Sequence, residues 1–437
     1  MSGQIHQETL TEALARRLTV AVDADTRARA GLHLVDWLGC AIAGRMQPAA
    51  ETAAMVRPEG MSGDAFYLGL LGNILEMDDV DKRAILHPGP SIIPAALAMV
   101  LSTPDLLPHL PDAIVSGYEA TIRLGRATGP GHYSLWHTTG TCGAIGAAAA
   151  CARLLNLDDL HTAHALSLAM SQATGLWQTR HEPGSMGKQL HTAHAARAGL
   201  DSARLASAGF TGPLSVLEGQ QGFFAACAPQ ANPADILKSY DHDWLIHEVS
   251  FKPWAACRHA HAAIDAALEL HERGLDADQI EKIRVETYAD ALKFCDKPDP
   301  STTIEAKFSL QHSVAVVLRK GRPEISDFDP AAITKSDNAG LRAKVSVSST
   351  HPYEAAYPAR YGAAVTVTLA NGRQLAAKAP DALGDPENPL SAEEVRLKAM
   401  VLMRHAGMDE SSAQGLLDHA GALSGNFLPA LREALLS

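Results

Sequence analysis

The first group of chemistry-bearing residues combines three carboxylates, one lysine and one histidine, namely Glu76, Asp78, Asp79, Lys82 and His87. A carboxylate beside an imidazole can orient the ring and tune its affinity for a proton, as general acid–base catalysis requires. A solvated helix end with surface ion pairs has the same composition. This group alone therefore leaves a catalytic and a structural interpretation open.

Two further groups begin at predicted helices. His137 directly precedes the small-residue run 140–150, so it lies at a helix start, where the dipole favours anions and lowers a histidine pKa. A structural histidine would fit there too. Lys188 opens a helix over 187–208, where the dipole opposes a cation unless an acidic partner or ligand is near. His191 and His194 follow on one face, but two histidines are weak evidence for a metal, and core packing explains them as well.

The fourth group, Lys252, Arg258 and His261, lies in residues 251–261, at the joint between two predicted domains. Small-molecule sites favour such joints, although a charged hinge would look alike. Together the four groups would form a cationic pocket in a chain of net charge −12. Lysine and arginine bind carboxylates by charge-assisted hydrogen bonds, and histidine can move a proton at an α-carbon. The sequence has no glycine-rich phosphate loop, G-x-S-x-G or H-E-x-x-H motif to favour other chemistries.

The composition of the 437 residues, 46% hydrophobic and 20% charged, is typical of a globular chain with two or three compact units. The negative charge disfavours nucleic acid as a partner. The first residues do not form a signal peptide and no apolar run approaches a membrane span, which predicts a cytoplasmic protein with no membrane contact. Six scattered cysteines without a C-x-x-C pair indicate reduced thiols and weigh against an iron–sulfur cluster.

The chain changes its hydrophobic periodicity after about residue 250. Helical patterns precede this point, whereas alternating patterns later predict strands, with a hairpin at Asn371-Gly372. The sequence thus predicts a mainly α protein with an α+β second domain. The expected parts are a helical domain over 1–250, an α+β lid domain over 251–388, and C-terminal helices over 389–437 that return to the helical domain. The specific segments are helices over 25–44, 62–79, 91–102, 110–128, 140–155, 157–176, 187–208 and 305–319, and strands over 280–288, 343–348 and 362–369.

Eight pieces of the sequence, in order along nearly the whole chain, resemble the MmgE/PrpD family, which includes 2-methylcitrate dehydratase, cis-aconitate decarboxylase and iminodisuccinate epimerase. The resemblance implies a homodimer whose subunits have a large all-helical domain and a smaller α+β lid, with the active site between them and no cofactor. The matching pieces are GLHLVDWLGCAIAG, EMDD…HPGPSIIPAALA, YEATIRLGRATGPGHYSLWHTTGTCGAIGAAAACARLLNL, LSLAMSQATGLW, GSMGKQLHTAHAARAG…AGFTGP, FKPWAACRHAHAAIDAALEL, EAKFSLQHSVAV and GDPENPLS.

The resemblance also assigns roles to positions of this chain. His87 and His137 match the histidines expected to transfer protons, and Lys188 and Lys252 match lysines expected to hold substrate carboxylates. Asp78 joins them as a catalytic candidate. The substrate-binding candidates are Glu76, Asp79, Lys82, Arg258, His261 and His191, and no metal ligand is expected.

Several positions depart from the family pattern. Glu76 and Val80 stand where Asp and Thr are usual, the loop that carries Asp81 to Arg83 is about one residue longer, and Thr138 replaces a common proline. A hydroxyl lost and a methylene gained in a polar pocket change which substrate fits, which weakens the case for cis-aconitate decarboxylation. The expectation is dehydration of a small di- or tricarboxylic acid by proton abstraction α to a carboxylate. An epimerase, which the chain length also favours, a decarboxylase and a non-catalytic carboxylate-binding relative remain alternatives.

Overall fold

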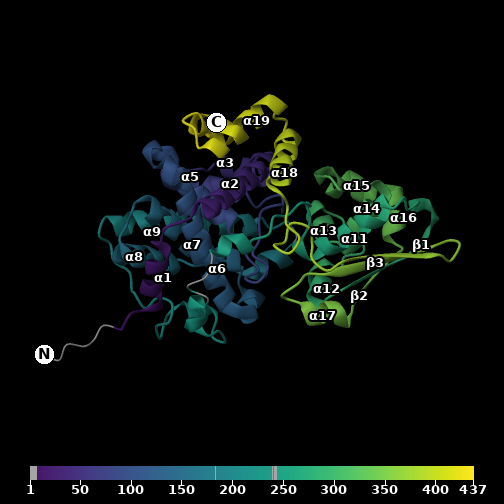
Figure 1. Cartoon of the computed structure of the whole chain (residues 1–437), viewed down its shortest axis with the longest axis horizontal. Helices are drawn as coiled ribbons and strands as arrows, with labels where there is room; N and C mark the ends of the chain where they lie inside the picture. Colours follow the sequence, from purple (N-terminus) through teal and green to yellow (C-terminus); the bar gives the residue numbers. More distant parts are fainter. Residues whose placement is uncertain (1–6, 183, 239, 241–243) are drawn as a thin grey trace. The chain divides into compact units, whose positions relative to one another are not determined.

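The chain divides into two compact units in a computed structural model that describes residues 7–182, 184–238, 240 and 244–437. One unit comprises Met1–Val249 and Ser391–Ser437, and the other comprises Ser250–Leu390 (Figure 1). The first is helical, and the second combines helices with a four-stranded sheet. The predicted fold class, mainly α with an α+β second domain, is confirmed. None of the helices in the described ranges has both the length and the apolar character that a bilayer span requires.

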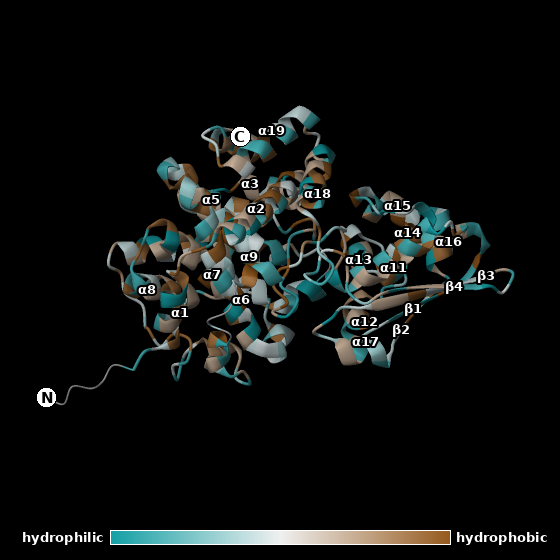
Figure 2. Ribbon diagram, viewed as in Figure 1, coloured by the Kyte–Doolittle hydropathy of each residue, from teal (hydrophilic) through white to brown (hydrophobic). Residues whose placement is uncertain are grey.

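The helical unit is built around α7, which packs against α5, α6, α8 and α9. Close approach depends on small residues at the contacts. A Cβ on Gly199 of α9 would lie only 2.5 Å from the backbone nitrogen of Ala148 on α7. In Figure 2 many helices of this unit carry both hydrophobic and hydrophilic residues, as expected where one face of a helix packs inward. The bounds are α1 Leu10–Leu18, α2 Ala24–Gly44, α3 Pro48–Ala54, α4 Met61–Leu71, α5 Gly89–Ser102, α6 Leu110–Leu135, α7 Thr138–Leu154, α8 Asp159–Met170, α9 Gly187–Ser207, α10 Phe223–Cys227, α18 Ala392–His405, α19 Glu410–Ala422 and α20 Phe427–Leu436.

The helix expected over 62–79 ends early, at Leu71, and its acidic residues lie in a loop instead. Gly72, the C-cap residue, keeps helical dihedrals and lies against the Trp37 indole, so close that an added Cβ would be 2.5 Å from the ring nitrogen. Glu76 has a φ of 60°, in the left-handed region that a right-handed helix cannot contain. The loop is then pinned by paired backbone hydrogen bonds between Asp81 and Leu86.

The α+β unit holds a sheet with strand order β2-β1-β3-β4. Strand β2 runs parallel to β1, and the other two neighbouring pairs are antiparallel, with Asn371-Gly372 turning β3 into β4 as predicted. The helix expected over 305–319 is two helices, because Ser309 caps the second one through the backbone N–H of His312. The bounds are β1 Ile280–Thr287, β2 Val345–Ser349, β3 Ala363–Leu369, β4 Gln374–Ala379, α11 His261–Glu272, α12 Ala289–Cys295, α13 Thr303–Lys307, α14 Leu310–Lys320, α15 Pro330–Thr334, α16 Ser336–Arg342 and α17 His351–Ala356.

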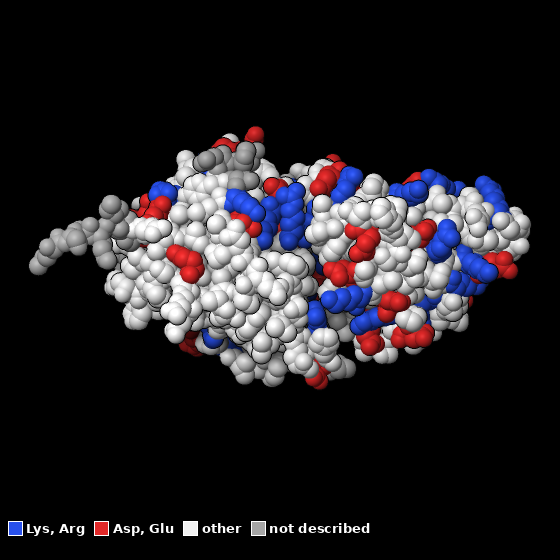
Figure 3. Space-filling view, turned by 90° about the horizontal axis from the view of Figure 1, so that it is seen from below, with Lys and Arg blue, Asp and Glu red and all other residues white. Residues whose placement is uncertain are grey.

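Surface charge differs between the two units. On the face in Figure 3, lysine, arginine and acidic side chains crowd the α+β unit, whereas the helical unit shows a broad uncharged area with scattered charges. Charged side chains are therefore not spread evenly over this face.

Candidate active site

His87 lies at the end of the acidic loop, and Asp78 orients its ring. Its Nδ1 is 2.9 Å from Asp78 Oδ2 and 2.8 Å from the Asp79 carbonyl oxygen. Both neighbours accept hydrogen bonds, so Nδ1 carries a proton, and Nε2 is the nitrogen that can exchange one. Asn73 fixes the carboxylate in turn, because its Nδ2 donates to Asp78 Oδ2 over 2.6 Å. This Asp–His pair can act as an oriented acid or base.

The carboxylate of Asp79 accepts hydrogen bonds from three other residues of the protein. Its Oδ2 accepts from the Tyr118 hydroxyl at 2.5 Å and from His33 Nδ1 at 2.7 Å, and its Oδ1 accepts from the backbone N–H of Gly89 at 2.9 Å. Burial lowers the pKa of His33 to about 4, so the ring is a neutral donor at pH 7. Asp79 thus ties the loop to α2, α5 and α6. These contacts hold the loop in place, and the substrate contact expected of Asp79 from the sequence stays a prediction.

Lys188, in the first turn of α9, meets the acidic partner that its position calls for. Its Nζ is 2.5 Å from Glu76 Oε1, and the Glu76 side chain is only 3% exposed. Glu76 reaches the lysine from its left-handed backbone conformation, an unfavourable geometry that proteins retain mostly at functional positions. The pair places a buried negative charge and a partly exposed positive charge side by side, where an incoming carboxylate can compete for the ammonium group.

His137 and His191 form a pair of neutral rings. Their Nδ1 atoms are 3.2 Å apart, and the Trp177 ring lies 4.4 Å from the His137 ring, centroid to centroid. Burial holds the pKa of His137 well below its usual value, and Lys188, His191 and His87 lower it further. Burial and then Lys188 lower the pKa of His191 to about 4. Both rings are therefore uncharged at pH 7, and a neutral imidazole is the form that can remove a proton.

The acidic loop and the start of α7 are joined directly, because the His87 backbone N–H donates to Thr139 Oγ1 over 3.0 Å. The structure therefore brings Glu76, Asp78, His87, His137, Lys188 and His191 together within the helical unit. Chemically, this cluster combines a cation for a carboxylate, a neutral base and a carboxylate-oriented imidazole.

Four candidates remain. Lys82 is buried in the acidic loop, and Lys252, Arg258 and His261 belong to the α+β unit. Within that unit Arg258 forms an ion pair with Asp385, and its Nη1 lies 3.1 Å from His261 Nδ1. The expectation that these residues share a site with the helical-unit cluster stays a prediction.

The histidines of α9 have separate partners. His194 Nε2 lies 3.3 Å from the Gln172 carbonyl oxygen, whereas His191 faces His137. In the part of the chain that the structure describes, no set of three or more His, Cys, Asp or Glu side chains is grouped to hold a metal ion.

Four buried residues around the cluster were missed in the sequence: His33, Asp36, Tyr118 and Lys398. His33 and Asp36 did carry a signal, because two polar residues three apart interrupt the apolar run 30–43 on one helical face. Lys398 gave none, since its helix is rich in charged residues.

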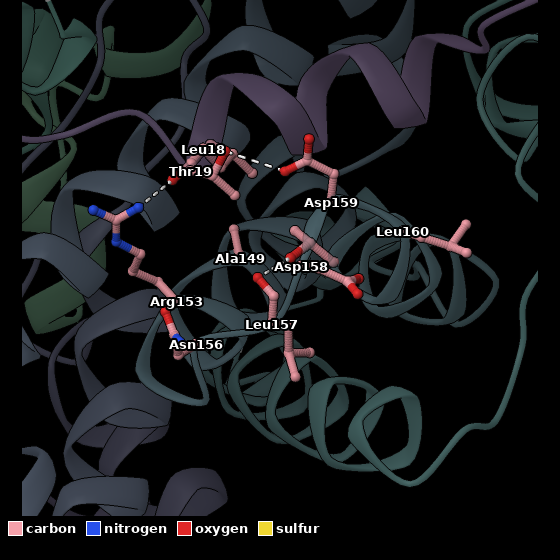
Figure 4. A pocket seen from close by; sticks show the side chains of 10 residues that line it. Leu18, Thr19, Ala149, Arg153, Asn156, Leu157, Asp158, Asp159 and Leu160 are labelled. Atoms are coloured by element: carbon pink, nitrogen blue, oxygen red, sulfur yellow. Dashed lines mark hydrogen bonds between the residues drawn. The ribbon is translucent and has the colours of Figure 1, made fainter.

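A surface hollow of about 640 Å³ lies away from this cluster, between the end of α1, the end of α7 and the start of α8 (Figure 4). Its polar groups already bond within the protein. Thr19 Oγ1 donates to Asp159 Oδ1 over 3.2 Å, and Arg153 Nη1 donates to the Leu18 carbonyl over 3.2 Å. None of the predicted site residues lines this hollow.

Comparison with known families accounts for most of the chain. Residues 60–235 match the MmgE/PrpD N-terminal domain, and residues 254–419 match the MmgE/PrpD C-terminal domain. The chain belongs to the MmgE/PrpD family.

Curated relatives are distant. The cis-aconitate decarboxylase-like protein oryM of Aspergillus oryzae is 29% identical over 302 residues, 60% of this chain and 61% of that protein. The cis-aconitate decarboxylase of Homo sapiens is 26% identical over 355 residues, 76% of this chain and 71% of that protein. The mitochondrial 2-methylcitrate dehydratase of Yarrowia lipolytica is 26% identical over 242 residues, 53% of this chain and 46% of that protein. The chain thus spans between 46% and 71% of the length of these relatives.

Proposed function

We propose that this protein is a cofactor-independent lyase that removes a proton α to a carboxylate of a small di- or tricarboxylic acid, and that it dehydrates this acid. The observation that carries the proposal is the buried neutral His137, whose pKa is lowered by burial and then by Lys188, His191 and the Asp78-oriented His87. A base, a carboxylate-binding cation and an oriented acid are the groups that such an elimination needs. The names of the relatives, dehydratase and decarboxylase, support a lyase.

The proposed step divides the work among three side chains. Lys188 binds the substrate carboxylate and stabilises the negative charge that builds on it as the α-proton leaves. His137 takes that proton on Nε2, since its Nδ1 faces His191. The C–H electron pair forms the new double bond, the C–O bond breaks, and the departing hydroxide takes a proton from His87 to leave as water.

Decarboxylation is the second candidate, because relatives with that name align over more of the chain than the dehydratase does. In that reaction a carboxylate leaves as CO2, and a protonated histidine supplies the proton that replaces it. The departures at Glu76, Val80 and Thr138 favour dehydration, since they alter the polar lining expected of a decarboxylase of this family.

Incubation with candidate acids in heavy water, followed by proton NMR, tests the proposal. Loss of water with a new alkene signal supports dehydration, and released CO2 supports decarboxylation. Deuterium at the α-carbon without an alkene would indicate an epimerase instead. Saturable binding of the acids with no reaction would indicate a non-catalytic relative.

We carry over two further expectations from the resemblance as proposals. The first is a homodimer, for which light scattering after gel filtration should give twice the 46.2 kDa mass of the chain. The second is that Lys252 contacts substrate, for which Lys252→Ala should lower kcat/KM without lowering the melting temperature by more than a few degrees. A monomeric mass, or wild-type kinetics for that variant, would contradict them.

A further inference from the structure

The C-terminal segment reaches the acidic loop through one buried lysine. Lys398 on α18 is buried, and its Nζ donates to Asp36 Oδ1 on α2 over 2.6 Å and to the Met77 carbonyl oxygen over 2.5 Å. Met77 stands between Glu76, the partner of Lys188, and Asp78, the partner of His87. A single ammonium group therefore holds the loop at the point between its two functional carboxylates.

The contact leaves the lysine little freedom. Helices α2 and α18 touch so closely that a Cβ on Gly39 would lie 2.7 Å from the Cα of Ala399. The packing of Gly39 against Ala399 thus fixes the backbone next to Lys398, and Asp36 fixes its ammonium group. Because a peptide unit is planar, holding the Met77 carbonyl also sets the direction of the Asp78 N–H and Cα.

We propose that Lys398 is a positioning residue of the active site, which fixes the Met77 carbonyl and thereby aims Glu76 at Lys188 and Asp78 at His87. Its effect on turnover rests on the proposed function. A contribution to folding stability alone is the rival explanation, because Lys398 and Asp36 also form a buried ion pair. The two explanations predict different kcat values for a variant in which both charges are removed together.

The decisive variant is Asp36→Leu with Lys398→Met. A buried ion pair can often be replaced by apolar residues of similar size without loss of stability, whereas removing one partner strands a charge. The double variant restores apolar packing but cannot donate to the Met77 carbonyl. Arg396→Met is the matched control, since Arg396 lies on the same helix and pairs with Asp418 at the surface.

We expect the double variant to melt within a few degrees of wild type but to lose about 10- to 100-fold in kcat, the scale of small misplacements of catalytic groups. Arg396→Met should keep wild-type kcat. Wild-type kcat in the folded double variant would overturn the proposal. If the double variant does not fold, Lys398→Arg takes its place. Arginine keeps the positive charge, but its guanidinium N–H groups cannot occupy the position from which the lysine ammonium donates to the Met77 carbonyl. Wild-type kcat for that variant would overturn the proposal equally.

A second readout does not depend on turnover. In protein labelled with 15N-histidine, the ring signals of His87, assigned with His87→Gln, report its tautomer and titration. The double variant should shift them relative to wild type and Arg396→Met. Unchanged His87 signals would refute positioning by Lys398. A shifted His87 in a protein that transforms no carboxylic acid would leave the positioning intact and refute the proposed function.

Discussion

The Nδ1 atoms of His137 and His191 face each other across 3.2 Å, so only one of them can carry the proton that joins the rings. His137 can accept a proton on Nε2 only if its own Nδ1 is the donor and His191 is the acceptor. The pKa of His191, lowered to about 4, keeps that ring neutral and able to accept. His191 can thus accept from His137 Nδ1, which is the tautomer that the proposed base role of His137 at Nε2 requires.

This arrangement predicts different effects for two substitutions of His191. Asparagine places an oxygen near the position of Nδ1 and keeps an acceptor, whereas leucine removes it. We expect His191→Leu to lower kcat about 100-fold, at the lower end of a lost general-base contribution, and His191→Asn to retain most activity. Steady-state kinetics would measure both. His194→Asn, one turn further along α9, should behave as wild type, and equal kcat for His191→Leu and wild type would contradict the tautomer argument.

Lys188 and Glu76 offer a test that separates activity from stability. Lys188→Met should abolish carboxylate binding, with a drop of at least about 100-fold in kcat/KM, the scale of losing one charge-stabilising donor. It should also destabilise the fold, because the buried Glu76 loses its partner. Adding Glu76→Gln should restore the urea midpoint but not the activity. Recovery of both in the double variant would show that the lysine serves only the fold.

Asp78 and Asp79 are adjacent but should respond in opposite ways to amide substitution. Asp78→Asn keeps an oxygen for Asn73 and His87 but removes the negative charge beside the His87 ring, so we expect lower kcat with a near-normal melting temperature. Both carboxylate oxygens of Asp79 accept hydrogen bonds. Asp79→Asn replaces one oxygen with an NH2 group, which cannot accept from the donor it then faces, and this should cost about 2–3 kcal/mol in the free energy of unfolding. Urea titration and kinetics on both variants check this. Equal stability losses would contradict the division of roles.

The sequence predicts the fold class well, because hydrophobic periodicity separates the helical residues from the strands 280–287 and 363–369. It predicts less about local breaks. The loop after α4 contains Glu76 in a left-handed conformation, and its partner Lys188 lies 112 residues away, so no window around residue 76 contains this contact.

The same limit applies to the site. His137 and Lys188 could be selected by type and by position near helix starts, and His87 by its place after the acidic residues. Lys398 could not, since it lies 321 residues from the Met77 carbonyl that it holds. Asp79 was a candidate for binding substrate, but its hydrogen bonds inside the protein follow only from the positions of His33 and Tyr118.

Buried neutral histidines should make the fold sensitive to mild acid. Burial lowers the pKa of His33 and of His259 to about 4, from the ordinary 6.5. In the unfolded chain both rings bind protons below about pH 6.5, so the unfolded state takes up more protons in the window between 6.5 and about 4. The stability that these histidines contribute is complete above pH 6.5 and is lost as the pH falls through this window. Asp36, whose burial raises its pKa to about 6, opposes the trend in part.

Urea unfolding at pH 7.5, 6.0 and 5.0 should therefore show a steadily falling midpoint. His33→Asn, which keeps a polar side chain but cannot titrate, should flatten the decline relative to wild type even though it lowers stability at pH 7.5, because the hydrogen bond from Nδ1 to Asp79 is altered. His405→Gln, at an exposed position, should leave the slope unchanged. A wild-type midpoint that rises between pH 7.5 and 5.0, or an equal slope in His33→Asn, would mean that His33 is not held neutral by burial.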